Sequence, residues 1–404
     1  MICEGRSMVA DFRFIVVGRG MMGAAAARHL ARQTDGIAVI GPDEPENRNS
    51  HEGVFGSHYD EGRITRTIDP DQDWARLANR SISRYAEIER DSGIQFYAPV
   101  GCLVTGPKRG SETTYVGDVV EAAERLGVRT DILDDAGLKA KFPFFSFASG
   151  SEGVFEPQGA GHISPRRLVK AQSQLAEEAG ARVIKQTALS IRGADGLAVV
   201  TTAEGETFSA EKVLLAAGGF SIAENLLPRP VEMKVYGRTV TFFEVSETEA
   251  EALSGMPSLI SVKPDDVDSI YMLPPIRYPD GKYYIKIGGD PDDLQFETEA
   301  ELRAWFRTAG RDKAREHLVR IFHDLVPGVK RVPSFTNSCV VSYSPSGYPM
   351  IGYTSSRRVA VLTGGCGMAA KSSDEIGRLG AELLLAGRIK DEGYSTDFSA
   401  YFRS

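Results

Sequence analysis

The chain has 404 residues, of which 42% are hydrophobic and 25% are charged, and its formal net charge is −8. This length exceeds what one hydrophobic core usually supports, so two domains are expected. The acidic balance disfavours nucleic acid and anionic membranes as partners. Four scattered cysteines without a CxxC pair, and six histidines without metal-ligand spacing, disfavour a disulfide framework or a bound metal. With neither a cleavable leader nor a membrane span in the sequence, a cytoplasmic protein that acts on a small molecule is expected.

The first predicted unit is the stretch FRFIVVGRGMMGAAAARHLARQTDGIAVIG, which has the pattern of a βαβ unit. We expect a strand at residues 14–17, a helix at 23–32 and a strand at 37–40. Between the first strand and the helix, Gly18, Gly20 and Gly23 fit G-x-G-x-x-G, which predicts a dinucleotide site with phosphate at the helix N-terminus. Met22 lies in the same turn and is a further predicted cofactor contact. The alternative is a glycine-rich turn in an unrelated α/β fold.

One expected part of this site is missing. The acid that usually ends the second strand and binds a ribose hydroxyl is replaced by Gly41, so Asp43 or Glu44 is the candidate substitute. Arg19 inside the glycine turn would suit a 2′-phosphate, but the acidic GPDE sequence beside it makes NADP the minor interpretation.

Two further apolar runs end in Gly-Gly, at residues 213–221 and 359–387. A strand end of this form suits close packing against a bound ligand. The predicted contacts there are Gly218, Gly364, Gly365 and Gly367. Since three such strand ends are spread over the whole chain, an extended cofactor in an interleaved domain is expected, which favours FAD over a nicotinamide cofactor.

The segment NSCVVSYSP carries the clearest family signature. With it, nearly the full chain resembles the FAD-dependent amine oxidases of the D-amino acid oxidase superfamily, most closely the monomeric sarcosine oxidase and N-methyltryptophan oxidase group. In that group a cysteine at this position holds the flavin through an 8α-thioether bond, with a proline six residues later. The resemblance implies that Cys339, followed by Pro345, is a covalent FAD anchor. The alternative is a buried packing thiol, which is our interpretation of Cys102 and Cys366.

The resemblance also implies roles for three cationic residues. In SHYDEGRITRTI, Arg63 would lie near the flavin ring and Arg66 would bind the substrate carboxylate together with Lys371, which also lies close to the cofactor. A guanidinium fork suits a carboxylate. The alternative is that both arginines are solvated strand charges.

Three residues are the predicted ring-facing contacts. Lys286 lies on an alternating strand, and the resemblance implies that it promotes the reaction of reduced flavin with oxygen; the alternative is a snorkelling surface lysine. Tyr271 aligns with a pocket tyrosine that could contact the amine. Asp290 replaces the family's pocket histidine and would change the charge of the site, unless it belongs to a solvated turn.

The predicted fold class is α/β, with a Rossmann-like FAD-binding domain (1–95, 151–228 and 331–404) interleaved with an antiparallel-sheet substrate domain (96–150 and 229–330). The predicted function is oxidation of a secondary or N-methyl amino acid by hydride transfer to FAD. Imine hydrolysis and reoxidation by O2 to hydrogen peroxide would follow, in a monomer. The alternatives are a dehydrogenase that uses a quinone or protein acceptor and a non-catalytic flavin-binding protein.

Overall fold

The glycine-rich turn near the N-terminus follows a buried strand, as the sequence predicts. Strand β1 (Phe12–Val17), helix α1 (Met21–Ala31) and strand β2 (Ile37–Ile40) form the βαβ unit, and both strands pair in parallel. The strand and the helix each begin two residues earlier than predicted. Alanine-rich α1 is buried along almost its whole length, because small side chains let neighbouring helices approach it closely.

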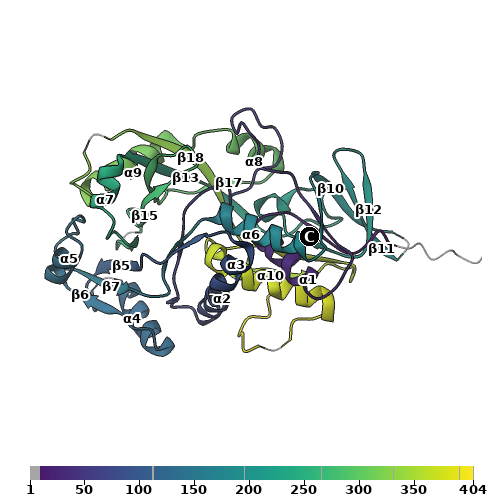
Figure 1. Cartoon of the computed structure of the whole chain (residues 1–404), viewed down its shortest axis with the longest axis horizontal. Helices are drawn as coiled ribbons and strands as arrows, with labels where there is room; N and C mark the ends of the chain where they lie inside the picture. The colour runs from purple at the N-terminus through teal and green to yellow at the C-terminus, as the bar shows by residue number, and fades with distance from the viewer. Residues whose placement is uncertain are drawn as a thin grey trace, which may run out of the picture.

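The computed structural model describes residues 10–111, 113–194, 196–264, 266–330, 332–390 and 392–403. It shows a mixed α/β chain of two domains, each built on its own large sheet (Figure 1). Cys3 lies outside the described residues.

The first sheet has eight strands in the order β10-β11-β12-β1-β2-β9, with β20 beside β12 and β19 beside β20. Its remaining strands are β9 (Arg182–Ile184), β10 (Ala188–Ala194), β11 (Leu197–Thr202), β12 (Thr207–Leu215), β19 (Met350–Tyr353) and β20 (Val359–Thr363). Strands β9, β2, β1, β12 and β20 are parallel neighbours. Their carboxyl ends therefore meet at one edge, where an open α/β sheet binds its ligand.

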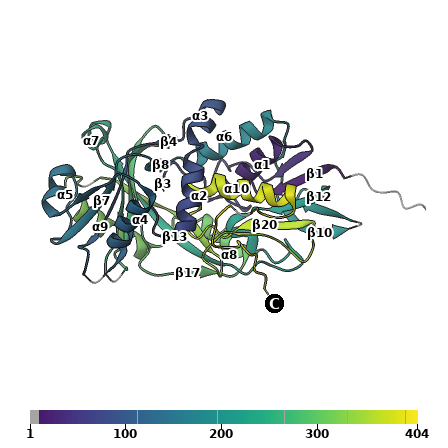
Figure 2. The same cartoon turned by 90° about the horizontal axis from the view of Figure 1, so that it is seen from below.

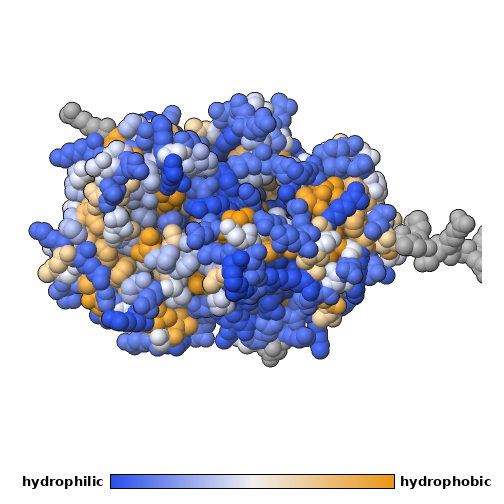
Figure 3. All heavy atoms as spheres, viewed as in Figure 1, coloured by the Kyte–Doolittle hydropathy of each residue, from blue (hydrophilic) through white to orange (hydrophobic). Residues whose placement is uncertain are grey.

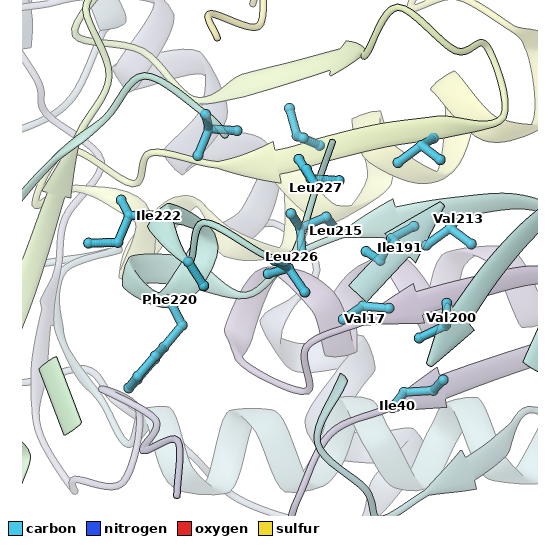
Figure 4. Close-up of a cluster of buried hydrophobic side chains, with 14 of the residues drawn as sticks. Val17, Ile40, Ile191, Val200, Val213, Leu215, Phe220, Ile222, Leu226 and Leu227 are labelled. Atoms are coloured by element: carbon cyan, nitrogen blue, oxygen red, sulfur yellow. The ribbon is translucent and has the colours of Figure 1, made fainter. Parts of the chain in front are cut away.

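One face of this sheet packs into an aliphatic core. Figure 4 shows Val17, Ile40, Val200, Val213 and Leu215 from neighbouring strands pointing into it. The short 3₁₀ helix η1 (Gly218–Ile222), directly after β12, adds Phe220 and Ile222. This packing fixes the chain that leaves the Gly-Gly end of β12.

Helices cover the opposite face (Figure 2). Helix α1 packs between α6 (Pro165–Glu178) and α10 (Ala369–Ala386), and α10 also packs on α2 (Gln72–Ile82), which α3 (Tyr85–Ser92) follows. Buried Asp374 of α10 accepts hydrogen bonds from Arg28 of α1 at 2.7 Å and from Gln172 of α6 at 2.9 Å. The helical layer is thus held by both apolar packing and a buried ionic contact.

The second sheet has nine strands in the order β17-β13-β16-β15-β14-β5-β7-β6, with β18 beside β13. Its strands are β5 (Cys102–Pro107), β6 (Asp131–Leu133), β7 (Ser151–Glu156), β13 (Lys234–Val245), β14 (Ser258–Ser261), β15 (Ile270–Arg277), β16 (Tyr283–Gly288), β17 (Leu294–Phe296) and β18 (Ser334–Tyr343). The helices of this region are α4 (Tyr115–Leu126), α5 (Asp135–Lys141), α7 (Glu247–Ala252), α8 (Glu299–Phe306) and α9 (Asp312–Leu325). A separate small sheet joins β3 (Arg63–Thr65), β8 (Gly161–Ile163) and β4 (Tyr97–Ala98).

The two faces of the second sheet have different surroundings. Phe243 of β13 stacks on Phe322 of α9, with ring centroids 3.6 Å apart, so this face forms the domain core. On the opposite face, Phe242 lies opposite both Lys286 and Phe335, and Cys339 follows Phe335 by four positions in β18. Because side chains alternate along a strand, Lys286 and Cys339 share this second face.

Strand pairing differs from the domain boundaries drawn on the sequence. Strands β7 and β18 belong to the segments 151–228 and 331–404, which the sequence assigned to the FAD-binding domain. In the structure, however, β7 pairs with β5 and β18 pairs with β13, both in the nine-stranded sheet. The pattern of residues within a strand does not reveal its partner, since the partner is chosen by long-range backbone hydrogen bonds.

The described residues contain no helix that is long and apolar enough to cross a membrane. On the face seen in Figure 3, hydrophobic residues form small patches that hydrophilic residues separate. Exposed large hydrophobic residues include Ile132, Leu189 and Phe335.

The contact between α1 and α10 gives a test of the fold. A Cβ at Gly377 would lie 2.5 Å from the Cβ of Ala25 and 2.6 Å from the backbone nitrogen of Ala26. Backbone atoms cannot move aside, so we expect Gly377→Ala to reduce the free energy of unfolding by about 1–3 kcal/mol. Denaturant unfolding followed by circular dichroism measures this change.

The matched control is Gly117→Ala in helix α4, where a new Cβ would meet only Arg109 Cγ at 3.9 Å. Helix propensity should raise the stability of this variant by up to about 1 kcal/mol. Equal stability changes in the two variants would contradict the close packing of α1 on α10.

Candidate active site

A cavity of about 380 Å³ opens at the carboxyl ends of the parallel strands. Gly18, Gly20, Met22 and Gly218, four of the predicted cofactor contacts, line it. The cavity thus lies at the edge of the sheet that the glycine motif predicts, and it brings together segments far apart in the sequence.

The three glycines of this turn differ in what a Cβ would meet at each position. Gly18 has φ +112°, and a Cβ there would lie 2.3 Å from Ala216 O, while a Cβ at Gly23 would lie 1.9 Å from Gly18 O. At Gly20 a Cβ would meet only His58 Nδ1, at 3.8 Å, because this residue faces the cavity. Helix α1 begins at this point without a side-chain cap or a first-turn acid. Its free N–H groups and open glycine cradle fit a pyrophosphate, as FAD requires.

The ribose end departs from the common pattern. A Cβ at Gly41 would lie 2.9 Å from Arg19 Cγ, so the arginine fills the space next to the strand end. Arg19 donates to Gly41 O at 3.0 Å and to Asp43 at 2.8 Å, and Lys185 pairs with the same carboxylate at 2.7 Å. The predicted ribose acceptor Asp43 therefore lies at the rim, between two cations, and outside the residues that line the cavity.

Strand β18 and the first residue of helix α10 border the other end of the cavity, where Val340 and Ala369 line it. Half-buried Cys339 points to the opposite side of β18 from Val340, and its Sγ is 3.6 Å from Arg63 Nη2. The predicted contacts Gly364, Gly365 and Gly367 follow β20, outside the lining of this cavity. Positive φ angles at Gly364 and Gly367 turn the chain into α10.

A buried charged cluster lies next to Cys339, and we call it the Asp60 cluster. The carboxylate of Asp60 accepts hydrogen bonds from Arg63 Nη1 and Lys286 Nζ at one oxygen, and from Tyr278 OH (2.8 Å) at the other. Lys286 also donates to Gly62 O at 2.8 Å and is fully buried. This burial excludes the surface interpretation of Lys286.

The pKa values in this cluster follow from burial and charge. Burial and, to a smaller extent, Arg63 lower the pKa of Lys286, whereas Asp60 raises it, and the net result is a pKa of about 8. Burial alone would raise the pKa of Asp60, but Lys286 and Arg63 hold it well below its ordinary value. At neutral pH the cluster therefore holds two cations and one anion.

A second cluster, the Asp69 cluster, lies beyond the other end of β3. Lys371 Nζ donates to Asp69 at 2.7 Å, and Arg66 Nη2 donates to Asp69 at 3.4 Å and to Tyr115 OH at 3.3 Å. Burial would raise the pKa of Asp69, but the two cations keep it low. Glu156 faces the same cluster and bonds the backbone N–H of Thr67 at 2.9 Å. The structure thus brings Arg66 and Lys371 together, and separates them from Arg63.

Tyr271 lies beside the Asp60 cluster, with Lys286 Nζ 5.8 Å from its ring centroid, and burial raises its pKa. The side chain of Asp290 is only 2% exposed, so the solvated turn is wrong. It accepts from the backbone N–H of Thr239 at 3.0 Å and pairs with Arg311 at 3.0 Å. Its charge is therefore matched by Arg311.

Sequence reasoning missed Asp60, Asp69 and Tyr278. A signal for the two aspartates is present in DEGRITRTID, where acids flank the arginines at a spacing of three residues. Tyr278 had no such signal, because its partner lies 218 positions away in the chain.

Comparison with known proteins places this geometry in context. The family model described as FAD dependent oxidoreductase matches residues 13–383. Monomeric sarcosine oxidase from Arthrobacter sp. (strain TE1826) is 24% identical over 96% of this chain and 95% of its own. N-methyl-L-tryptophan oxidase from Escherichia coli (strain K12) is 27% identical over 55% of this chain and 57% of its own. The solved structure of NikD, an unusual amino acid oxidase, has a TM-score of 0.76 and 20% identity, and the match covers 98% of this chain and 99% of NikD.

The glycine cradle predicts separable effects on folding and flavin binding. A Cβ at Gly20 would enter the cavity, so we expect Gly20→Ala to fold and to bind FAD at least about tenfold more weakly, a loss of about 1.4 kcal/mol. Quenching of FAD fluorescence by flavin-free protein measures the affinity.

Two controls accompany this variant. Gly255→Ala adds a Cβ with no neighbour within 4 Å, and should change neither folding nor affinity. Gly23→Ala should instead destabilise the fold, because its Cβ would overlap Gly18 O. Unchanged FAD affinity in Gly20→Ala would rule out a phosphate position at this turn.

Proposed function

The chain belongs to the FAD-dependent oxidoreductase family, and we propose that it oxidises the C–N bond of a secondary or N-methyl amino acid. The names of similar proteins support this substrate class, since monomeric sarcosine oxidase and N-methyl-L-tryptophan oxidase are both related in sequence. The fold alone would not support it, because one fold hosts many activities.

The observation that carries the proposal is the convergence of Arg66 and Lys371 on one carboxylate, Asp69. Among the described residues, Asp69 is the one side-chain acceptor of Lys371 Nζ, so this ammonium keeps further donors for a ligand. A guanidinium and an ammonium on the same side of a buried site suit a substrate carboxylate. We assign Arg66 and Lys371 to carboxylate binding.

Bound FAD would supply a hydride acceptor for the carbon next to the amine nitrogen, and its reduced form would pass two electrons to O2 to give hydrogen peroxide. Arg66 and Lys371 would hold the substrate so that this C–H bond faces the acceptor. Water would then hydrolyse the imine. Tyr271 is the proposed contact for the amine, and paired Asp290 would support the same wall of the pocket.

Lys286 has a separate role in the proposal. Its ammonium is fully buried beside Arg63, and a fixed positive charge stabilises negative charge that develops on O2 during reduction. This role favours an oxidase over a dehydrogenase with a quinone or protein acceptor. We further propose a monomer in the cytoplasm, in agreement with the free thiols of Cys102, Cys339 and Cys366.

Cys339 is the proposed covalent anchor of FAD. Its half-buried thiol lies 3.6 Å from Arg63, on the sheet face that carries Lys286.

A substrate panel tests the proposed activity. Under anaerobic conditions, N-methyl amino acids, proline, pipecolate and fructosyl amino acids are added to the flavin-loaded protein, and loss of flavin absorbance is recorded. We expect at least one secondary amino acid to bleach the flavin and air to restore the colour. Bleaching by none of them, or restoration only by a quinone, would contradict the oxidase proposal.

Lys371→Met tests the carboxylate contact with the same substrate. Loss of one charge-assisted hydrogen bond, worth about 1.5–3 kcal/mol, should weaken substrate binding about 10-fold to 100-fold. The control is Lys282→Met, which removes an exposed lysine that pairs with Glu244 at 2.8 Å. The amide form of the substrate carries no carboxylate charge, so the wild type and Lys371→Met should bind it with similar affinity. An equal loss for acid and amide would argue against a carboxylate contact.

Cys339→Ser tests the covalent anchor. After acid precipitation and washing, we expect a yellow pellet from the wild type and a colourless pellet from the variant, because a thioether survives acid. Cys102→Ser is the control and should keep the colour. A colourless wild-type pellet over a yellow supernatant would show that FAD is bound without a covalent link.

A further inference from the structure

Asp60 has an unusual number of donors for one side chain. Arg63 and Lys286 both bond its Oδ2, and Tyr278 OH (2.8 Å) and the backbone N–H of Glu61 (2.8 Å) both bond its Oδ1. These donors come from the loop before β3, from β3 itself, from β16 and from the turn after β15. A carboxylate with every lone-pair direction occupied is held rigidly, and so are its partners.

The charges make this contact more than structural. Arg63 and Lys286 both pair with one oxygen of Asp60, and Lys286 is fully buried from solvent. Without Asp60, an ammonium and a guanidinium would face each other unpaired, and burial disfavours the charged form of the lysine. Arginine stays protonated, so the lysine would lose its proton.

We propose that Asp60 is the positioning residue that keeps Lys286 charged and fixes it beside Arg63. The proposal rests on the role given above to Lys286, because only a protonated lysine can stabilise negative charge on O2. Asp60 acts through the lysine and need not touch substrate or cofactor.

The surroundings of Lys286 support this assignment. The titratable and charged groups that face it are Asp60 and Arg63 around β3, Tyr271 on β15, Cys339 on β18 and His162 on β8. Burial lowers the pKa of His162 to about 4, and burial raises the pKa of Tyr271, so both are neutral at pH 7. Among the described groups that face Lys286, Asp60 is thus the one carboxylate.

Tyr278 fixes the position of Asp60 from the far side. It lies in the turn between β15 and β16, and its ring packs edge-on against Phe242 (5.6 Å) and Tyr284 (5.3 Å). The IRYPDGK segment, residues 276–282, therefore supplies the hydrogen bond that orients this carboxylate.

The test is a direct titration of Lys286 in the flavin-loaded protein. Lysine is labelled with ¹³C at Cε, and the Lys286 resonance is assigned by its loss in Lys286→Arg. We expect a midpoint near or above neutral pH in the wild type, and a midpoint more than one pH unit lower in Asp60→Asn. Asp60→Glu, which retains the charge, should restore much of the wild-type value.

Asp280→Asn is the matched control. Its carboxylate lies in the same turn and accepts from Tyr284 OH at 2.6 Å, so its removal should leave the Lys286 midpoint unchanged. In case Asp60→Asn does not fold, Arg63→Met is compared with the double variant Asp60→Asn/Arg63→Met, in which one cation is removed together with the anion. The midpoint should again differ by more than one unit.

An unchanged midpoint in Asp60→Asn, or in the double variant relative to Arg63→Met, would overturn the proposal. The rate of reoxidation of the reduced protein by O2 is measured over the same pH range. It should fall as pH rises through the Lys286 midpoint, and this fall should move to lower pH in Asp60→Asn. If the reduced wild type does not react with O2, the oxidase proposal fails, while the titration still decides the role of Asp60.

Discussion

Two aspartates pair with four cations around one short strand, and three of these cations are buried while Arg63 is half-buried. Arg63 and Lys286 share Asp60 before β3, and Arg66 and Lys371 share Asp69 after it. Burying a charge without a partner destabilises the fold by several kcal/mol. The cations of each cluster therefore depend on the aspartate with which they pair. Strand β3 thereby sets the distance between the two clusters, and both domains contribute to them, since Lys286 lies on the nine-stranded sheet and Lys371 on α10.

The cofactor cradle rests on steric exclusion. Side chains larger than hydrogen cannot occupy the turn at Gly18 and Gly23, because backbone oxygens already lie where a Cβ would be. The close approach of β1, β12 and α1 leaves the helix N-terminus open toward the cavity. At the ribose end, Arg19 takes the space that an acid would need, so this end of the site depends on a different set of contacts from the common motif.

The two clusters are separate and differ in the groups that they offer. The Asp69 cluster offers donors suited to a carboxylate, and the Asp60 cluster holds positive charge next to Cys339. Arg63 is the first residue of β3 and Arg66 follows its last residue, and each pairs with a different aspartate. Substrate binding and electron transfer to oxygen would therefore be tuned by separate groups, and Asp290, neutralised by Arg311, lies outside both ion-pair sets.

The sequence by itself determined the βαβ unit, its glycine turn, the buried Gly-Gly strand ends and the α/β class, because these depend on local spacing and on side-chain volume. It also singled out Lys286, Arg66 and Lys371, although their grouping was an expectation from family resemblance. Only the tertiary structure decided which strands pair, that β7 and β18 join the second sheet, and that Asp60 meets Tyr278 from 218 positions away. The physical reason is that a charged residue or a strand can be recognised from the neighbouring residues in the sequence. Which residue or strand it pairs with depends on how the whole chain folds.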